Sequence, residues 1–334
     1  MVPWLSRSLL LVKVRANKNA ASTFRGPPPR IHMADHTLTL SNGLTLGYAE
    51  YGDPAGAVMF YFHGWPSGRV QGELMHEAGL KFGLRIIAPD RPGIGLSDFQ
   101  PRRRLLDWPP VLEELAAHAG AEKFHVLGWS GGGPYVLATA LKMPARLLSA
   151  TIVCGAPPLA FFGDAKMFWL YRLMIRLRGH FPSVLGAVLR LGALLARGSP
   201  DKPPLKWLMR LLLEPDRRVL ADPEVFRVVR AGMMESLRRG PRAVIGDADI
   251  YLSEWGFEVS SVTFPVHLWH GKMDRNIAWE YSAQLAELMP HADVHWLENE
   301  GHYSLPILHN EAILRHALGP GAAQIGRASC RERV

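Results

Sequence analysis

The chain has 334 residues, of which 48% are hydrophobic and 20% charged, so it can bury a sizeable core and is not intrinsically disordered. Its two cysteines, Cys154 and Cys330, exclude a disulfide framework and a cysteine-based zinc set, which favours a reducing compartment; we expect the cytoplasm. No apolar run approaches the roughly 18 residues that a membrane span needs.

The net charge of +8 is unevenly distributed along the chain. Residues 1–33 hold six basic residues and no acidic one, and residues 159–245 hold 16 basic and 7 acidic ones. The body outside these segments is acidic. Because a polyanion-binding protein carries a broad basic face, we expect no nucleic-acid partner.

Both ends are expected to lie outside the fold. Residues 1–33 are basic and interrupted by Pro27, Pro28 and Pro29. They indicate either an organelle-targeting leader or a natural start at Met33, and we favour the second. A genuine leader would change the expected location to an organelle. Residues 325–334, IGRASCRERV, resemble a translated sequencing adaptor, and a disordered polar tail is the alternative.

From His36 the pattern predicts a hairpin and then alternating strands and helices. The predicted strands are 37–40, 44–51, 57–62, 84–88, 124–127, 147–153, 265–269 and 294–297. The predicted helices between them are 72–82, 110–119, 132–141, 279–288 and 307–318. Short continuous apolar runs suit strands buried on both faces of a parallel sheet. The fold class is therefore α/β, with a mostly parallel, doubly wound sheet formed by residues 34–158 and 246–320.

Residues 159–245 interrupt this alternation. They contain helical patterns at 167–177, 183–196, 206–213 and 223–237 and no clear strand, which predicts an all-helical cap inserted between two strands. Its arginines lie among aromatic and aliphatic residues, a pattern typical of a lid over a pocket or of a basic membrane-binding face. We favour the lid, so membrane association is not expected.

The sequence Gly128-Trp129-Ser130-Gly131-Gly132 matches G-x-S-x-G between a predicted strand and a predicted helix. In this context the turn holds the serine in a strained conformation above the carboxyl edge of the sheet. Its hydroxyl also lies at a helix N-terminus, which favours developing negative charge. The motif predicts Ser130 as a nucleophile.

A serine nucleophile needs a general base and an acid that orients it. Asp274 follows a predicted strand 144 residues after Ser130, and His302 follows the last strand 28 residues later. Their order and their position at strand ends predict His302 as general base and then acid, and Asp274 as the orienting carboxylate. Asp164 is the rival acid.

The oxyanion that forms during such chemistry needs backbone donors. We expect the N–H groups of Gly131, which follows the nucleophile, and of Trp65, which follows the strand 57–62. His63, Gly64 and Trp129 are expected to contact the substrate.

No cofactor and no metal are expected. His267 and His270 are neighbours on one predicted strand without a third ligand, a pattern more typical of packing than of a metal site. The Gly93-x-Gly95 sequence lacks the third glycine of a dinucleotide loop, and a tight loop that feeds the site fits it better.

Together these motifs resemble the α/β-hydrolase superfamily. The resemblance spans about residues 36–318 and rests on the segments 63–66, 90–98 and 128–133, on His270-Gly271 with Asp274, and on Gly301-His302. It implies a serine hydrolase with a helical cap, since the dehalogenase and epoxide hydrolase branches carry aspartate where Ser130 stands.

The resemblance leaves the substrate open. We expect a serine hydrolase of the carboxylic ester class (EC 3.1.1) that acts on a small ester-like molecule. The alternatives are a cofactor-free perhydrolase or C–C hydrolase with the same triad, and a non-catalytic ligand-binding protein on the same fold.

Overall fold

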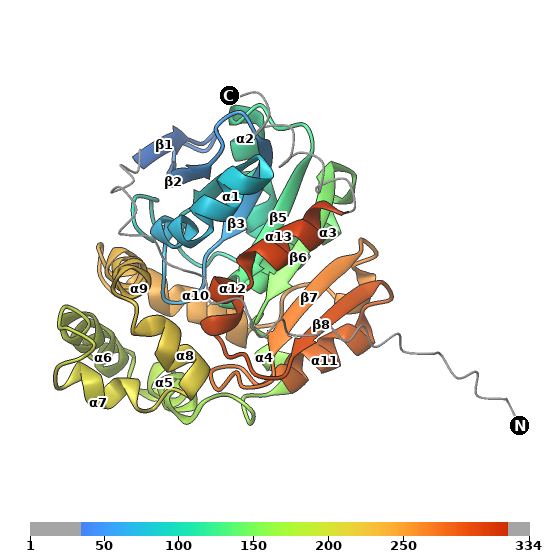
Figure 1. Cartoon of the computed structure of the whole chain (residues 1–334). Helices are drawn as coiled ribbons and strands as arrows, with labels where there is room; N and C mark the ends of the chain where they lie inside the picture. The colour runs from blue at the N-terminus through green and yellow to red at the C-terminus, as the bar shows by residue number, and fades with distance from the viewer. Residues whose placement is uncertain (1–34, 320–334) are drawn as a thin grey trace, which may run out of the picture. The chain divides into compact units, whose positions relative to one another are not determined.

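The computed structural model describes residues 35–319, and within this range eight strands form one sheet (Figure 1). The strands are β1 Asp35–Thr39, β2 Thr45–Gly52, β3 Ala57–Phe62, β4 Leu84–Pro89, β5 Phe124–Trp129, β6 Leu147–Val153, β7 Val266–Gly271 and β8 Ala292–Leu297. Their order across the sheet is β1-β2-β4-β3-β5-β6-β7-β8. The pairs β1-β2 and β2-β4 are antiparallel, and all neighbours from β4 to β8 are parallel. The predicted mostly parallel sheet is confirmed.

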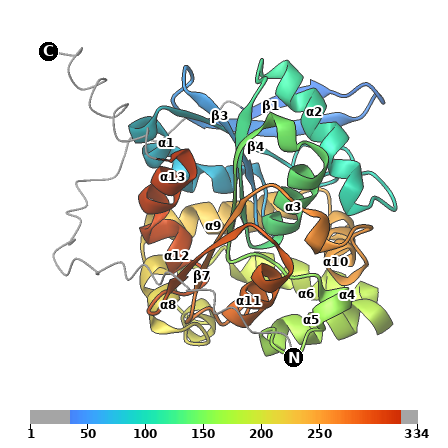
Figure 2. The ribbon, with the colours of Figure 1, turned by 90° about the vertical axis from the view of Figure 1, so that its right-hand side faces the viewer.

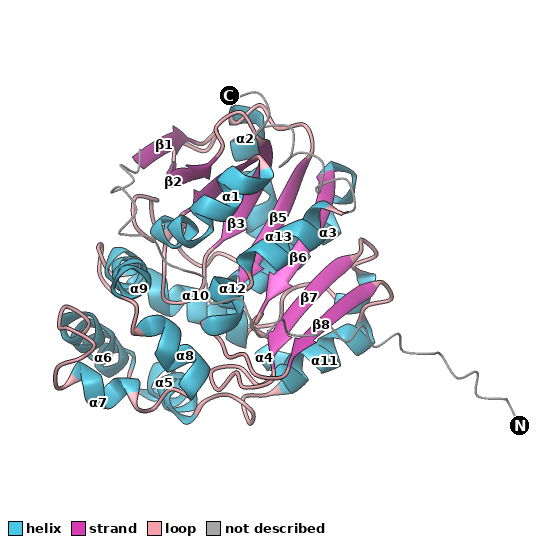
Figure 3. Ribbon diagram, in the orientation of Figure 1, coloured by secondary structure: helices cyan, strands magenta, loops and turns pink. Residues whose placement is uncertain are grey.

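Helices cover both faces of this sheet, which explains the continuous apolar runs of the central strands (Figures 2 and 3). On β3, Met59 and Tyr61 belong to the apolar layer beneath α1 His76–Phe82 and α13 Asn310–Leu318. Phe60 and Phe62 belong to the layer on the opposite face, which α2 Trp108–His118, α3 Gly133–Lys142 and α11 Trp279–Leu288 cover. Alternate residues of one strand therefore enter two different cores.

A run of helices connects β6 to β7. These are α4 Leu159–Phe162, α5 Trp169–His180, α6 Pro182–Leu195, α7 Leu205–Met209, α8 Glu214–Leu220, α9 Pro223–Ser236 and α10 Arg242–Leu252. We call residues 159–252 the helical insertion. It agrees with the predicted all-helical character, but α4, α8 and α10 were not predicted, and α10 continues past residue 245.

Short elements complete the described chain. They are the 3₁₀ helices η1 Arg69–Met75, η2 Leu105–Asp107, η3 Ser130–Gly132, η4 Pro144–Arg146 and η5 Val259–Ser261, and the helix α12 Ser304–Leu308. Among residues 35–319, no helix combines the length and the apolar composition required to cross a membrane. The predictions for residues 1–33 and 325–334 lie outside the described residues.

Candidate active site

Ser130 lies directly after β5 and opens η3, which leads into α3. Its backbone φ is 55°, in the left-handed region where a residue other than glycine costs about 1–3 kcal/mol. An ideal Cβ on Gly132 would lie 2.1 Å from the carbonyl oxygen of Phe62, so the turn can pack against β3 only because residue 132 is glycine. The strand-turn-helix context predicted for Ser130 is present.

Asp274 lies in the loop after β7, and protein donors surround its buried carboxylate. Oδ1 accepts hydrogen bonds from the N–H groups of Asn276, at 2.8 Å, and Ile277, at 2.9 Å. Oδ2 lies 2.7 Å from Nδ1 of His302 and 3.1 Å from Nε2 of His270. In the described chain it is therefore Asp274, and not the rival Asp164, that bonds to His302.

His302 lies in the loop after β8 and contacts the strand end that carries Ser130. The indole N–H of Trp129 donates to the carbonyl oxygen of His302 at 3.1 Å, and the two ring centroids are 6.0 Å apart. Because Trp129 immediately precedes Ser130, this contact brings the loop of His302 to the end of β5. Ser130, Asp274 and His302 thus lie at the same edge of the sheet.

The helical insertion contributes a carboxylate to this loop. Asp216 in α8 is buried, and its oxygens accept from the backbone N–H groups of His302, Tyr303 and Ser304 at 3.0, 2.8 and 2.9 Å. An ideal Cβ on Gly301 would lie 2.5 Å from Oδ1 of Asp216, so glycine at 301 allows this approach. Sequence reasoning missed Asp216, because an acidic residue in the first turn of a helix is common and signals no distant partner.

The surrounding charges set the protonation of His302. Burial alone would lower the pKa of its imidazole, but the carboxylates of Asp274 and, more weakly, Asp216 outweigh burial and raise this pKa above its usual value. For Asp274, burial opposes ionisation. The charge of His302, together with the hydrogen bonds from His270 and His302, outweighs burial and holds the pKa of this carboxyl well below its usual value. The pair is thus an ionised carboxylate that supports an imidazolium.

A cavity of about 60 Å³ opens above Ser130. The core contributes Trp65, Ser130 and Gly131, and the helical insertion contributes apolar side chains that include Met174 and Leu185. Arg178 also lines it, and its guanidinium is paired with Asp249. The cavity therefore suits an uncharged and largely apolar group.

Trp65 and Gly131, the two expected backbone donors, lie beside each other. An ideal Cβ on Gly131 would lie 3.0 Å from Cβ of Trp65 and 2.4 Å from the hydroxyl of Tyr251. The indole N–H of Trp65 donates to the carbonyl oxygen of Val244 in α10 at 2.7 Å, and the Tyr251 hydroxyl donates to the carbonyl oxygen of Gly131 at 3.1 Å. The helix α10 therefore fixes both residues, a contact that sequence reasoning did not predict.

A buried arginine holds the loop between β3 and Trp65. Arg91 donates to the carbonyl oxygens of His63 and Gly64 at 2.5 and 2.9 Å, and to Asp247 in α10 at 2.7 Å. The N–H of Gly64 in turn donates to Oε1 of Gln71 at 2.6 Å. These bonds leave the loop little freedom to move relative to Ser130.

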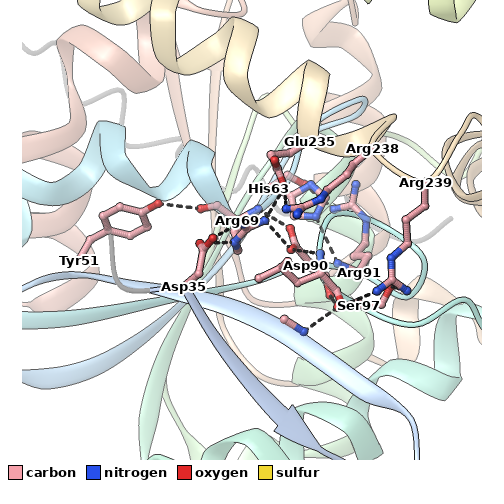
Figure 4. A network of polar contacts seen from close by, with 12 residues as sticks. Asp35, Tyr51, His63, Arg69, Asp90, Arg91, Ser97, Glu235, Arg238 and Arg239 are labelled. Carbon is pink, nitrogen blue, oxygen red and sulfur yellow. Dashed lines mark hydrogen bonds and ion pairs between the residues drawn. The ribbon is translucent and has the colours of Figure 1, made fainter. Parts of the chain in front are cut away.

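A second arginine continues this network, as Figure 4 shows. Arg69 in η1 pairs with Asp35 in β1 at 2.7 Å, with Asp90 after β4 at 3.0 Å and with Glu235 in α9 at 2.8 Å. The same residue thus joins the sheet, the loop after β4 and the helical insertion.

Comparisons with known proteins agree with this architecture. The model of the alpha/beta hydrolase family matches residues 59–316, which is well over half of the chain. The chain belongs to the alpha/beta hydrolase family. The crystal structure of a hydrolase from Pseudomonas aeruginosa PA01 superposes with a TM-score of 0.62 at 19% identity, covering 87% of this chain and 100% of that one. At this identity the likeness shows the fold alone.

Two curated relatives of this alpha/beta hydrolase match over shorter stretches. The non-heme chloroperoxidase of Streptomyces lividans is 30% identical over 134 residues, 39% of this chain and 48% of the relative. The bifunctional esterase/perhydrolase DCH of Acinetobacter calcoaceticus is 28% identical over 126 residues, 36% of this chain and 45% of the relative. The matches thus cover about half the length of these relatives.

Three residues that were expected to contact the substrate lie outside the lining of the cavity. His63, Gly64 and Trp129 are buried, and they are not among the residues that line the cavity. Burial first, and then the charge of Arg91, keeps the pKa of His63 well below its usual value, so its imidazole is neutral. Substrate contact by these residues stays a prediction, and their observed contacts are with the neighbouring loops.

Cys154 adds a thiol that the sequence did not single out. It lies after β6 with a φ of 49°, and its sulfur, a carboxylate oxygen of Asp274 and a ring nitrogen of His302 lie within 4.8 Å of one another. These three residue types could ligate a metal. Burial raises the pKa of the thiol well above its usual value, which disfavours a thiolate nucleophile.

Proposed function

We propose that the chain is a serine hydrolase that cleaves carboxylic esters through an acyl-enzyme. The observation that carries this proposal is the position of Ser130. The residue has a strained backbone at a strand end, it opens onto an apolar cavity, and it lies at the same sheet edge as the Asp274–His302 pair. Strain of this kind persists only where the surroundings hold it, and it clusters at functional sites.

In the proposed mechanism the Ser130 hydroxyl attacks the ester carbonyl, and His302 takes its proton. The backbone N–H groups of Trp65 and Gly131 hold the oxyanion, and a single such donor is worth about 2.7–4 kcal/mol in other enzymes. The imidazolium of His302, stabilised by Asp274, then gives its proton to the departing alkoxide. Water, deprotonated by His302, releases the acyl group from Ser130.

The proposed substrate is a small ester whose acyl or alcohol group is uncharged. The cavity is small and mostly apolar, and its arginine, Arg178, is already paired. We also propose that the helical insertion acts as the cap of this active site, since it supplies most of the side chains above Ser130.

A perhydrolase activity is the second candidate, because one relative is a bifunctional esterase/perhydrolase and another is a non-heme chloroperoxidase. In this reaction hydrogen peroxide would replace water in the attack on the acyl-enzyme and release a peracid. Peroxide-dependent halogenation, measured beside hydrolysis of p-nitrophenyl esters, separates the two activities.

The direct test is labelling with a fluorophosphonate probe, followed by mapping of the modified peptide. We expect the parent to hydrolyse a short p-nitrophenyl ester and to carry the label on Ser130. Ser130→Ala should lose both, whereas Ser253→Ala, an exposed serine after α10, should keep both. Ester hydrolysis with Ser130 unlabelled would contradict the mechanism. A parent without turnover whose ligand binding survives Ser130→Ala would favour a binding protein.

A further inference from the structure

Helix α13 covers one face of the sheet (Figure 1). Three histidines and one aspartate converge on that face. His267 in β7 is the register partner of Asp293 in β8, and Trp269 is the partner of His295. Because side chains alternate along a strand and register partners share a face, His267, Asp293 and His295 lie on the same side. His316 of α13 packs over them, with ring centroids 4.6 Å from His267 and 4.3 Å from His295.

The four side chains present their polar atoms to one point. Oδ2 of Asp293 lies 3.1 Å from Nδ1 of His267, 3.0 Å from Nε2 of His295 and 2.7 Å from Nε2 of His316. The Nε2 atoms of His295 and His316 are 3.1 Å apart. All four atoms lie within 4.8 Å of one another.

This spacing is close to that of a tetrahedral zinc site. With bonds of about 2.0–2.1 Å from zinc to nitrogen or oxygen, ligand atoms at the corners of a tetrahedron lie about 3.3–3.4 Å apart. These four distances of 2.7–3.1 Å would have to lengthen by a few tenths of an ångström, and the other two pairs of ligand atoms already lie within 4.8 Å. Side-chain rotations of that size need no movement of the strands.

Hydrogen bonding alone satisfies this cluster poorly. Each neutral imidazole has one donor nitrogen and one acceptor nitrogen. If the facing nitrogens of all three histidines donate to Oδ2 of Asp293, three protons crowd onto one oxygen. If one of these nitrogens is unprotonated, its lone pair faces the carboxylate. A central cation instead takes one lone pair from each of the four ligands.

We propose that His267, Asp293, His295 and His316 bind one zinc ion. Three imidazoles and one carboxylate are borderline and hard ligands that zinc accepts, and four of them close a structural site. The four side chains are between 20% and 47% exposed, so an ion can enter from solvent. The bound ion would join the last helix of the described chain to the edge of the sheet.

The zinc site is separate from the proposed active site. His267 and Asp293 are each the second residue of their strand, whereas Asp274 and His302 follow the carboxyl ends of β7 and β8. In parallel strands these positions are at opposite edges of the sheet. The zinc would therefore stabilise the fold and take no part in ester cleavage, and the inference does not depend on the proposed function.

The sequence did not predict this site because the residue considered beside His267 was His270. Positions three apart on a strand point to opposite faces. His270 accordingly bonds to Ser282 at 2.7 Å and to Asp274 at 3.1 Å, away from the zinc site. The other ligands follow His267 by 26, 28 and 49 residues, and only the pairing of β7 with β8 and the packing of α13 bring them together.

The test uses the full chain, treated with a chelator and then dialysed against Zn²⁺. We expect the parent to retain one zinc per chain and its Tm to rise when zinc is added. His316→Ala and Asp293→Asn should bind zinc at least about 10-fold more weakly, as the loss even of an outer partner costs about 10- to 100-fold in affinity. At the same zinc concentration their Tm should therefore rise less than that of the parent. His291→Ala, an exposed histidine just before β8, is the matched control and should behave as the parent.

The outcomes separate the zinc site from the buried group of Cys154, Asp274 and His302. Zinc bound by the parent and lost in His316→Ala, but kept in His302→Ala, supports the proposal. Zinc lost in His302→Ala and kept in His316→Ala would overturn it, as would a parent that retains no zinc. The Tm of each variant without zinc, compared with the parent, shows whether a loss of binding reflects unfolding.

Discussion

At the scale of single residues, the protonation of His302 sets the pH range of the proposed reaction. Only the neutral imidazole can take a proton from Ser130. Because Asp274 and Asp216 outweigh burial and raise the pKa of His302, we expect kcat/KM to fall on the acid side with an apparent pKa above 6.5. A pH profile of ester hydrolysis measures it.

The same profile tests the charge of Asp274. Asp274→Asn removes the carboxylate that favours the imidazolium and should lower kcat by roughly 10⁴-fold, as in other triads. The remaining activity should have its acid limb at lower pH than the parent. An acid limb at the parent's pH in this variant would mean that another group controls it.

Asp216 is a positioning residue, since its contacts are with the backbone of the loop that carries His302. Asp216→Asn leaves backbone donors of His302, Tyr303 and Ser304 with a poorer partner, which costs about 1–3 kcal/mol for each unsatisfied buried group. We expect kcat to fall roughly 10-fold or more, with KM little changed, because Asp216 does not line the cavity. The acid limb should also move to lower pH, because one negative charge near His302 is lost.

The control for Asp216 is Asp222→Asn. Asp222 caps α9 in the same insertion, where its carboxylate accepts from the N–H groups of Glu224 and Val225 of its own helix. Because asparagine caps helices about as well as aspartate, this variant should change the Tm little and leave the acid limb in place. If both variants lose activity with unchanged pH profiles, Asp216 has only a structural role.

Residues at strand ends could be predicted from the sequence, whereas residues that meet them from the insertion could not. Ser130, Asp274 and His302 each follow an apolar run, so the topology of a parallel sheet already places them at one edge. Asp216 lies 86 residues before His302, on a helix without a distinctive motif. Its role depends on how the insertion folds back, and no local pattern encodes that.

At the scale of elements, the turn from β5 to α3 depends on Gly132. A Cβ there would lie 2.1 Å from the carbonyl oxygen of Phe62, and backbone cannot move aside as a flexible side chain can. We expect Gly132→Ala to lower the free energy of unfolding by about 1–3 kcal/mol or more and to abolish activity. Chemical denaturation measures the first effect and ester hydrolysis the second.

Gly179→Ala is the matched control for this turn. Gly179 lies in α5, and an added Cβ would meet no atom within 4 Å. Alanine favours a helix over glycine by about 0.5–1 kcal/mol, so this variant should be as stable as the parent or slightly more stable. Equal losses in the two variants would contradict the role given to Gly132.

Element boundaries were predicted best where apolar periodicity was strong. The strands of the sheet and α9 were predicted within a few residues, because burial on both faces or on one face leaves a clear pattern. Helix α8 begins Glu214-Pro215-Asp216 and has only seven residues, so it showed too few apolar repeats. Helix α10 was missed because its residues contact both the cavity and Trp65. Its apolar residues therefore do not form one continuous stripe with a clear helical period.

At the scale of the whole described chain, ion pairs as well as apolar contacts join the helical insertion to the α/β core. Arg227 of α9 pairs with Glu73 of η1, and Arg239 after α9 pairs with Asp98 at 2.8 Å. Part of the basic charge of the insertion is thus matched by the acidic core. These ion pairs support the lid interpretation, and the alternative of a membrane-binding face stays open to a liposome flotation assay.

The insertion also shapes the cavity above Ser130, so we expect it to limit which substrates fit. The core supplies Ser130, but Met174 and Leu185 come from the insertion and limit the cavity to about 60 Å³. We expect the parent to hydrolyse p-nitrophenyl acetate and butyrate with a higher kcat/KM than the octanoate. Each methylene that the cavity can bury favours binding by about 0.8 kcal/mol, and this gain should end once the cavity is full.

Met174→Ala should enlarge the cavity and move the preferred acyl chain to greater length. Leu173→Ala is its control, because Leu173 precedes Met174 in α5 but is 43% exposed and does not line the cavity. A series of p-nitrophenyl esters, measured for the parent and both variants, separates the effect of the cavity from that of general hydrophobicity. If the parent prefers octanoate, or if Met174→Ala and Leu173→Ala give the same profile, the cavity above Ser130 does not hold the acyl chain.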